Sequence, residues 1–143
     1  MDRDVETGLV KIDGQELPGA LEQISVWHEI IIDETTHSYN YEAGAPAALS
    51  GVSVRIVPGQ RGIFTAAQVE AVVRPDGAHF PHSRLVIVEN TNNRGAGSIW
   101  PLDTVASLRP VAERHGLHIH MDGARLMNAC TSSSERLCTM SLP

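Results

Sequence analysis

Short apolar runs alternate with helix-like segments along the middle of this 143-residue sequence, and this alternation limits the possible folds more than any other feature. Four apolar runs are typical of buried strands: Glu29–Asp33, Val52–Val57, Leu85–Val88 and Leu117–Met121. Three segments between them have helical spacing: Tyr41–Leu49, Ala66–Val73 and Pro101–His115. Strands that alternate with helices of about ten residues indicate βαβ units. The sequence therefore predicts an α/β fold with a mostly parallel sheet and flanking helices.

A parallel sheet of this kind also predicts where a ligand binds. In such sheets the carboxyl ends of the strands carry the binding residues. Three parts of the sequence follow predicted strands and contain polar side chains: His37, the segment 89–94 and the segment 122–125. We expect these three parts to form the functional site.

Composition and charge exclude several classes of protein. Hydrophobic residues make up 42% of the chain and charged residues 20%, as in ordinary globular domains. The net charge is −6 with no basic block, which disfavours a nucleic-acid-binding protein. No apolar run approaches the ~20 residues that span a bilayer, and the acidic start is unlike a secretory signal. Two cysteines, Cys130 and Cys138, predict no disulfide framework and no zinc site, so a reducing cytoplasm is expected.

The basic residues are unevenly divided between arginine and lysine. Ten of the eleven are arginine, and the single lysine is Lys11. The setting of Lys11, between Gly8 and Gly14, resembles a short hairpin or turn. Any reaction of this chain that requires a lysine nucleophile must therefore use Lys11.

The densest chemical signal is the segment from His118 to Arg125. On a strand, His118, His120 and Asp122 project from one face, because strand side chains alternate with a period of two. Such a face can bind a metal ion. Alternatively, Asp122 can pair with a cofactor nitrogen while Arg125 binds a substrate carboxylate. The third interpretation is a solvated strand that ends in an Asp–Gly turn, and spacing alone does not decide among the three.

A wider pattern of motifs resembles one family of enzymes. The motifs are, in order, Glu29–Asp33, His37, Tyr41–Gly44, Ala48–Gly51, Val57–Gly59, Arg74–Pro75, His79–Pro81, Glu89–Thr91, Asn93–Arg94, Gly97, Pro101–Leu102, Glu113, His115–Gly116, His120–Leu126 and Asn128–Ala129. Together they resemble the low-specificity L-threonine aldolases, within the aromatic amino acid beta-eliminating lyase/threonine aldolase grouping. The resemblance implies part of the large domain of the aspartate-aminotransferase-like (fold type I) pyridoxal-phosphate enzymes. It also implies a lyase that cleaves threonine or other β-hydroxy amino acids to glycine and an aldehyde.

The resemblance implies a role for each of three residues. Asp122 would face the pyridine nitrogen of pyridoxal phosphate and keep that nitrogen protonated, so that the ring accepts electrons from the breaking Cα–Cβ bond. Arg125 would bind the substrate carboxylate, which suits its planar guanidinium group. His37 would stack on the cofactor ring and lie near the substrate hydroxyl, whose proton must leave.

Three departures from the family pattern limit what this chain is expected to do. Family members hold the cofactor through a Schiff base to a lysine well after the Asp-Gly-Ala-Arg motif, where this chain has no lysine. They bind the cofactor phosphate with a Ser-Gly-Thr type loop, which residues 1–27 do not contain. They usually have histidine where this chain has Asn92, so Asn92 is expected at the substrate hydroxyl.

We therefore expect a divergent segment at 1–27, a partial threonine-aldolase-like large domain at 28–130 and a frayed tail at 131–143. The isolated chain is expected to be inactive, without a resident metal ion. Its family implies an amino acid substrate and a homo-oligomer in the complete member. Two alternatives stay open: a non-catalytic fragment that docks on a full-length relative, and a metal-dependent hydrolase that uses His118, His120 and Asp122.

Overall fold

The computed structural model describes residues 2–3, 10–12, 15–17 and 28–132. The first three pieces form a small antiparallel sheet of β1 (Asp2–Arg3), β2 (Val10–Ile12) and β3 (Gln15–Leu17). Lys11 lies in β2 opposite Glu16 of β3, so the expected hairpin around it is confirmed. The other expectations for the divergent segment and for the frayed tail fall largely outside the described residues.

A second sheet contains the four predicted strands. They are β4 (His28–Asp33), β5 (Ser53–Val57), β6 (His82–Glu89) and β7 (His118–Asp122), arranged in the order β5-β4-β6-β7. Every neighbouring pair is parallel, as the alternation of strands and helices predicts. The expected α/β fold is confirmed. Strand β6 begins three residues earlier than expected, because its polar first residues pair with the start of β4.

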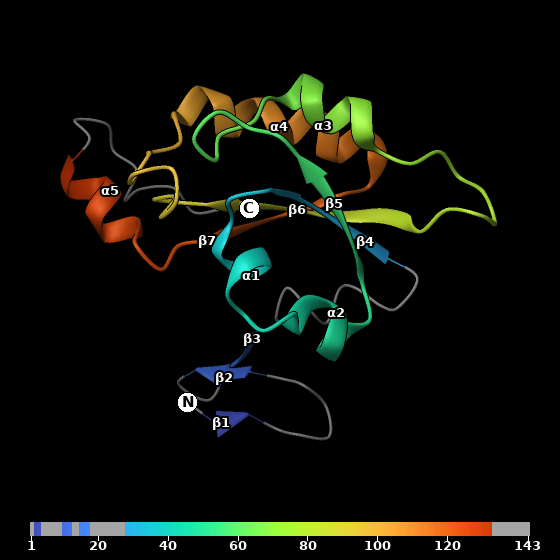
Figure 1. Cartoon of the computed structure of the whole chain (residues 1–143), viewed down its shortest axis with the longest axis horizontal. Coiled ribbons are helices and arrows are strands. Elements are labelled where there is room, and N and C mark those ends of the chain that lie inside the picture. The colour runs from blue at the N-terminus through green and yellow to red at the C-terminus, as the bar shows by residue number, and fades with distance from the viewer. Residues whose placement is uncertain (1, 4–9, 13–14, 18–27, 133–143) are drawn as a thin grey trace.

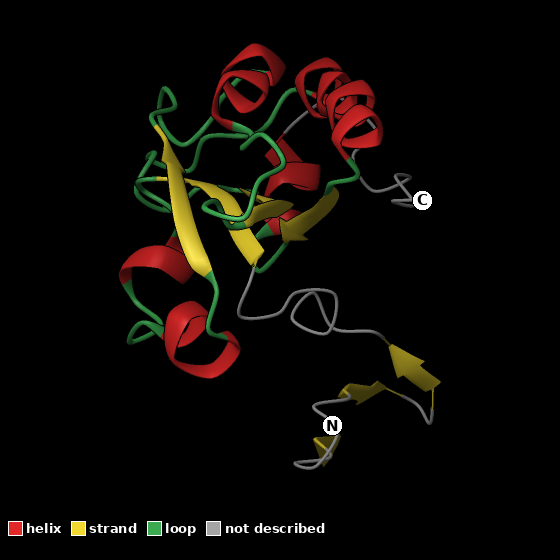
Figure 2. Ribbon diagram, turned by 90° about the vertical axis from the view of Figure 1, so that its right-hand side faces the viewer, coloured by secondary structure: helices red, strands yellow, loops and turns green. Residues whose placement is uncertain are grey.

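Helices cover both faces of the parallel sheet (Figures 1 and 2). One face carries α3 (Ala66–Val72) and α4 (Leu102–His115), and the other carries the short helices α1 (His37–Asn40) and α2 (Ala45–Ser50). A fifth helix, α5 (Leu126–Ser132), follows β7. Coverage of both faces explains why the strands read as continuous apolar runs rather than alternating ones.

Local sequence accounts for where α3 begins and where α4 ends. Thr65 and Gln68 form a capping box at the start of α3, in which each side chain binds the other residue's backbone N–H. Helix α4 ends at Gly116, which adopts the left-handed conformation at φ 62° that glycine accommodates without strain. The helix continues through Pro110.

Two expectations about helices need correction. The sequence predicted one imperfect helix over 41–49, whereas residues 41–44 form a turn and only α2 lies in this range; α1, before it, was not predicted. Gly44 explains the late start, because its left-handed conformation at φ 74° does not continue a helix from Tyr41, and α2 begins directly after it. Helix α5 was not among the helices that the sequence predicted.

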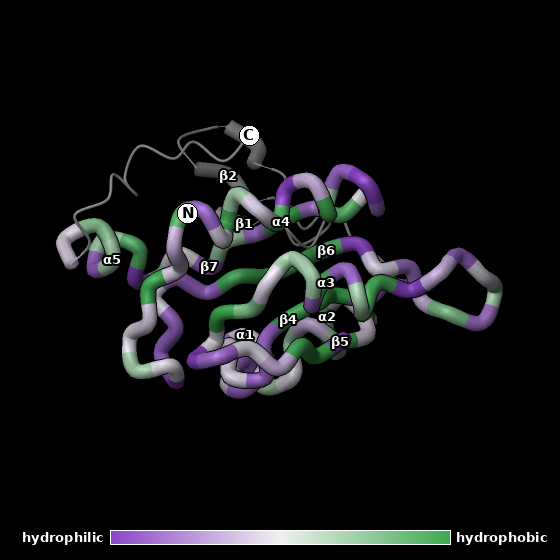
Figure 3. The backbone as a smooth tube through the Cα atoms, turned by 90° about the horizontal axis from the view of Figure 1, so that it is seen from above, coloured by the Kyte–Doolittle hydropathy of each residue, from purple (hydrophilic) through white to green (hydrophobic). Residues whose placement is uncertain are grey.

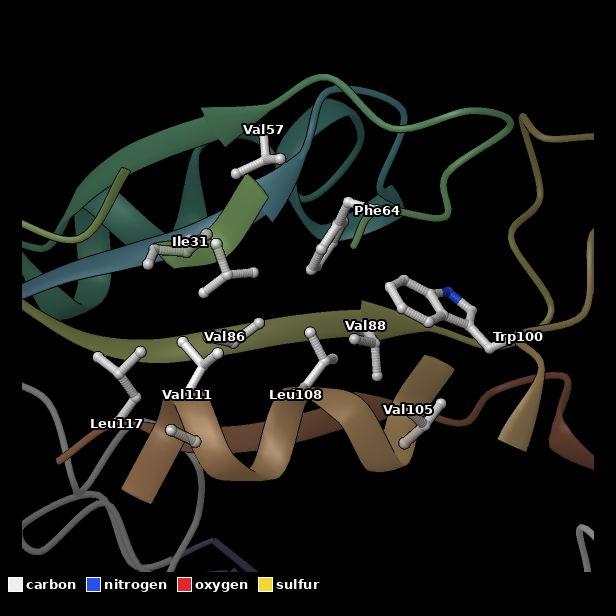
Figure 4. Packing of buried hydrophobic residues seen from close by; sticks show 12 residues of the cluster. Ile31, Val57, Phe64, Val86, Val88, Trp100, Val105, Leu108, Val111 and Leu117 are labelled. Carbon is white, nitrogen blue, oxygen red and sulfur yellow. The ribbon is translucent and has the colours of Figure 1, made fainter. Parts of the chain in front are cut away.

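The larger part of the core lies between the sheet and the pair α3–α4 (Figure 4). Phe64 and Trp100 are both fully buried there, and their rings meet edge to face with centroids 4.8 Å apart. The opposite face of the sheet is covered by a smaller apolar cluster around Ile30, Ile32 and Leu85. The apolar stretch of β6, green in Figure 3, contributes to both clusters: Val86 and Val88 belong to the larger one, and Leu85 and Ile87 to the smaller one.

Two further findings concern the expectations drawn from composition. No helix in the described part of the chain is long and apolar enough to cross a membrane. Cys130 on α5 is disulfide-bonded, which goes against the expectation of no disulfide framework. Sequence spacing alone does not show which thiols approach within bonding distance.

Candidate active site

The carboxyl ends of the four parallel strands are joined by hydrogen bonds that bring their loops together. Asp33 ends β4 and lies opposite Val57 at the end of β5, while Glu89 ends β6 opposite Asp122 at the end of β7. The backbone N–H of Asn90 donates to the carbonyl of Asp122, 2.9 Å away. The three parts that were predicted to form the functional site, His37, 89–94 and 122–125, therefore follow neighbouring strands at one edge of the sheet.

Glu89 is the buried carboxylate that organises this edge. Its side chain is 3% exposed and accepts three hydrogen bonds. The donors are the backbone N–H of His37 at 2.9 Å, the backbone N–H of Asn93 at 3.0 Å and the Asn92 side-chain amide at 3.2 Å. Glu89 thus ties the first turn of α1 to the loop after β6. A buried carboxylate is tolerated because these donors replace water.

Asp33, at the end of β4, also holds two loops together, here the loops after β4 and β5. Its side chain accepts from the backbone N–H of Thr35 at 2.7 Å and from the backbone N–H of Gly59, also at 2.7 Å. A Cβ atom on Gly59 would lie 2.7 Å from the carboxylate and 2.7 Å from the carbonyl of Ile63. The close approach of the β5 loop to Asp33 therefore requires glycine at position 59.

His37 lies at the start of α1, and the surroundings of its two ring nitrogens differ. Its ring stacks on Tyr41 at a centroid distance of 4.9 Å, and Nε2 lies 3.1 Å from the Glu42 carboxylate. Nδ1 is buried and has no hydrogen-bond partner among the described residues. The backbone bond to Glu89 fixes where this imidazole emerges from the sheet edge.

Asp122 and Arg125 provide opposite charges just beyond β7. Asp122 is half-buried, and its Oδ1 accepts the backbone N–H of Ala124 at 3.2 Å. Within the part of the chain that the structure describes, the Arg125 side chain makes no hydrogen bond or ion pair. Both side chains therefore retain hydrogen-bonding capacity for a ligand.

Asn92 lies in the interior of the same edge. It is fully buried, and its Oδ1 accepts the backbone N–H of Gly95 at 2.6 Å and the Thr35 hydroxyl at 3.3 Å. Its amide nitrogen donates to Glu89. These contacts make Asn92 a structural centre of the loop after β6, and its contact with the substrate hydroxyl stays a prediction.

The metal alternative finds no support in the geometry. Among residues 28–132 and the three short strands before them, no group of three or more histidine, cysteine, aspartate or glutamate side chains is placed to hold a metal ion. His118, His120 and Asp122 follow one another at every second position of β7, but they form no such group.

Sequence reasoning did not assign functions to Asp33 and Glu89, although both residues appear in the motifs. The available signal was their position, since each carboxylate directly follows a buried apolar run and precedes a polar loop. Which backbone N–H groups they accept depends on the order of the strands in the sheet, which the sequence did not show.

Fold and site together define an α/β domain of the fold type I class, with its polar residues at the carboxyl edge of a parallel sheet. A family model described as "Beta-eliminating lyase" matches residues 20–141. The chain belongs to the beta-eliminating lyase family.

Individual relatives agree with this assignment. The chain is 36% identical over 104 residues to a probable low-specificity L-threonine aldolase 2 of Arabidopsis thaliana, covering 71% of this chain and 29% of the relative. It is 35% identical over 109 residues to a probable low-specificity L-threonine aldolase of Schizosaccharomyces pombe, covering 75% and 28%. A solved structure of Leishmania major threonine aldolase superimposes with a TM-score of 0.70 at 25% identity, covering 76% and 31%. The chain thus spans less than a third of the length of these relatives.

Proposed function

We propose that this chain carries part of the active site of a pyridoxal-phosphate-dependent aldehyde lyase of the threonine aldolase type. The substrates would be threonine and other β-hydroxy amino acids, and the products glycine and an aldehyde. The observation that carries the proposal is that Asp122 and Arg125 follow each other at the end of β7, at the same edge of the sheet as a His37 held by Glu89. Family membership and the named relatives support the same chemistry.

The described residues fit one side of the cofactor. The half-buried Asp122 carboxylate has only one of its oxygens engaged by a described residue, so it can accept a hydrogen bond from a protonated pyridine nitrogen. When bound, pyridoxal phosphate supplies an electron sink for the breaking Cα–Cβ bond.

Arg125 and His37 would act on the substrate. The Arg125 guanidinium is free of described partners and matches a substrate carboxylate in a two-point contact. The His37 imidazole can take the proton of a substrate hydroxyl at Nε2 once that atom leaves Glu42, 3.1 Å away. Asn92 would assist indirectly, by holding the loop after β6 in place through Glu89.

The described residues offer no lysine at the candidate active site that could form a Schiff base with the aldehyde of the cofactor. The single lysine of the chain, Lys11, lies in β2 of the separate antiparallel sheet. We therefore expect the isolated 143-residue chain to form no covalent bond with pyridoxal phosphate, to retain it poorly and to be inactive alone. A cytoplasmic setting and a homo-oligomeric complete protein stay predictions.

Borohydride reduction after incubation with pyridoxal phosphate, followed by mass measurement, tests the covalent part. The expected result is no stoichiometric adduct, together with no release of acetaldehyde from threonine. A single adduct at Lys11, or steady acetaldehyde release, would contradict the proposed inactivity.

Binding of pyridoxamine phosphate, which lacks the aldehyde, tests the ring-facing part independently. NMR shifts are expected at His37 and at 122–125. The Asp122→Asn variant should weaken binding about tenfold or more, because it removes the charged acceptor. Asp103→Asn, on the outer surface of α4, is the control. Equal binding by the two variants would overturn the assignment of Asp122.

A second candidate function is non-catalytic docking on a longer relative. Strands β5 and β7 are the edges of the described four-stranded sheet, and Leu49 and Met127 are large apolar side chains that are 73% and 71% exposed. A partner that adds to the sheet would cover such surface. A monodisperse monomer by light scattering, with no complex formed on mixing with a full-length relative, would exclude this function.

A further inference from the structure

A cavity of about 730 Å³ opens at the amino ends of the parallel strands, on the edge opposite the candidate active site. Four separate parts of the chain line it: the start of β4, the segment after α3, the start of β6 and the end of α4. The basic side chains among its described lining residues are Arg74, Arg84, Arg114, His28, His82 and His115. The strand register explains part of this grouping, since His28 of β4 pairs directly with His82 of β6.

The positive charge of this cavity contrasts with the net charge of the whole chain, which is −6. Asp76 is the only carboxylate among the described lining residues. Its side chain is 97% exposed, and its contact with the His82 imidazole is 3.5 Å long. Asp76 therefore does little to neutralise the three arginines.

Arg84 is the least neutralised of these arginines. Its Nη1 donates to the carbonyl of Gly116 at 2.8 Å, and within the described residues it forms no ion pair with a carboxylate. A guanidinium group has five N–H donors, so most of those on Arg84 remain available. A neutral carbonyl orients the group without cancelling its charge.

The other two arginines are fixed by carboxylates that lie outside the lining. Arg74 lies 3.4 Å from the buried Glu29, and Arg114 lies 2.6 Å from Glu70. These contacts hold the guanidinium groups in place, which lowers the entropy cost of ordering them around a ligand. Both groups retain donors beyond those the ion pairs use.

His28, at the start of β4, is one of the residues that line the cavity. The pKa of His28 lies below its usual value because of partial burial and then because of repulsion from Arg84 and His82. The other charged and titratable groups that line the cavity are Arg84 and His82 on β6, Arg74 and Asp76 after α3, and Arg114 and His115 on α4. The carboxylates of Glu29 and Glu70 lie beside Arg74 and Arg114. An anion among them would relieve the repulsion and raise the pKa of His28.

We propose that this cavity binds a small molecule that carries a chain of two or more phosphate groups. Planar guanidinium groups on separate elements suit several phosphate oxygens at once. The volume lies in the range of small-molecule sites, which is larger than a single phosphate needs. The inference is independent of the proposed lyase function, because none of the lining residues belongs to the carboxyl edge.

Titration of the complete 143-residue chain with inorganic tripolyphosphate tests the proposal, with calorimetry for affinity and NMR for location. Shifts are expected at His28, His82 and Arg84, together with a raised pKa of His28. Arg84→Gln should weaken binding about tenfold or more, and Arg84→Lys should restore part of the loss. The control is Arg109→Gln, which removes one positive charge from an exposed arginine on α4 paired with Glu113.

The two arginine variants distinguish specific binding in the cavity from general attraction between the anion and positive charge on the protein. Loss of binding in Arg84→Gln with retention in Arg109→Gln supports the proposal. Equal losses in the two variants, or no binding of tripolyphosphate to the unchanged chain, overturn it. Should Arg84→Gln fail to fold, shifts confined to the carboxyl edge in the unchanged chain would overturn the proposal equally well.

A comparison with ATP identifies the source of the phosphate groups. Equal affinity for ATP and tripolyphosphate assigns the site to the phosphate chain alone. Tighter binding of ATP assigns it to a nucleotide. Both results support the proposal.

Discussion

Buried carboxylates are the residues on which the ends of the parallel sheet depend. Glu29, Asp33 and Glu89 are each at most 3% exposed, and each accepts hydrogen bonds from groups on another element. A carboxylate at such depth is costly unless its partners replace water. Each of these residues therefore holds a loop or strand end in one position.

The first prediction concerns Glu89. Glu89→Gln places an amide where three N–H groups now converge on a charged acceptor, so at least one donor loses its partner. We expect the free energy of unfolding to fall by about 1–3 kcal/mol, measured by urea denaturation. The same substitution at the exposed Glu113 is the control. Equal stability of the two variants would show that Glu89 does not organise this edge.

A second prediction concerns the space beside Asp33. Gly59→Ala puts a methyl group 2.7 Å from the Asp33 carboxylate, so the loop after β5 must move. We expect a loss of about 1–3 kcal/mol of stability. Gly77→Ala is a matched control, because the nearest atom to its new methyl group is a Phe80 ring carbon 3.7 Å away. Urea denaturation of both variants should give a clear loss only for Gly59→Ala.

At the scale of elements, α3 and α4 are tied together where they approach the amino edge of the sheet. Glu70 on α3 accepts from Arg114 at 2.6 Å and contacts His115 at 2.7 Å, both at the end of α4. Arg114 and His115 lie in the last turn of α4, where basic side chains also stabilise a helix because its carboxyl end carries a partial negative charge. The pair of helices is thus joined by packing along its length and by charge at one end.

The third prediction follows from the titration of Glu70. Hydrogen bonds from His115 and Arg114 hold the pKa of Glu70 below its usual value of 4.5. A carboxyl group with a lowered pKa in the folded state contributes stability above pH 4.5, and this contribution is lost as the pH falls through the folded-state pKa. The unchanged chain should therefore exceed Glu70→Gln in stability near neutral pH, with the difference shrinking in acid.

Urea denaturation of both proteins at a series of pH values checks this result. Glu113→Gln should show no comparable pH-dependent difference, since its partner Arg109 lies on the same exposed helical face. A difference between the unchanged chain and Glu70→Gln that grows as the pH falls would contradict the prediction.

At the scale of the whole molecule, stability depends on the core between the sheet and α3–α4. Leu108 of α4 is 1% exposed and belongs to the same cluster as Val86 and Trp100. The fourth prediction is that Leu108→Ala lowers the free energy of unfolding by about 2–5 kcal/mol through lost burial and a residual cavity. Leu49→Ala, at a side chain 73% exposed, should change it by less than about 0.5 kcal/mol. Similar losses at the two positions would contradict the described packing.

The sequence by itself determined the four strands, their parallel arrangement, and the helices α3 and α4. Apolar runs, the cap at Thr65 and the stop at Gly116 are local signals, because periodicity and capping depend on residues close together in the chain. Local signals also placed His37, Asp122 and Arg125 after strands, and so at one edge of the sheet.

Only the tertiary structure decided which of these ends meet, and through which atoms. The order β5-β4-β6-β7 places β4 between its two neighbours, so Asp33 accepts from Gly59 while Glu89 accepts from His37. The same order gathers Arg84 and Arg114 around one cavity at the opposite edge. These contacts join residues at least 25 positions apart, which no local pattern encodes, because strand order and register arise when the whole core packs.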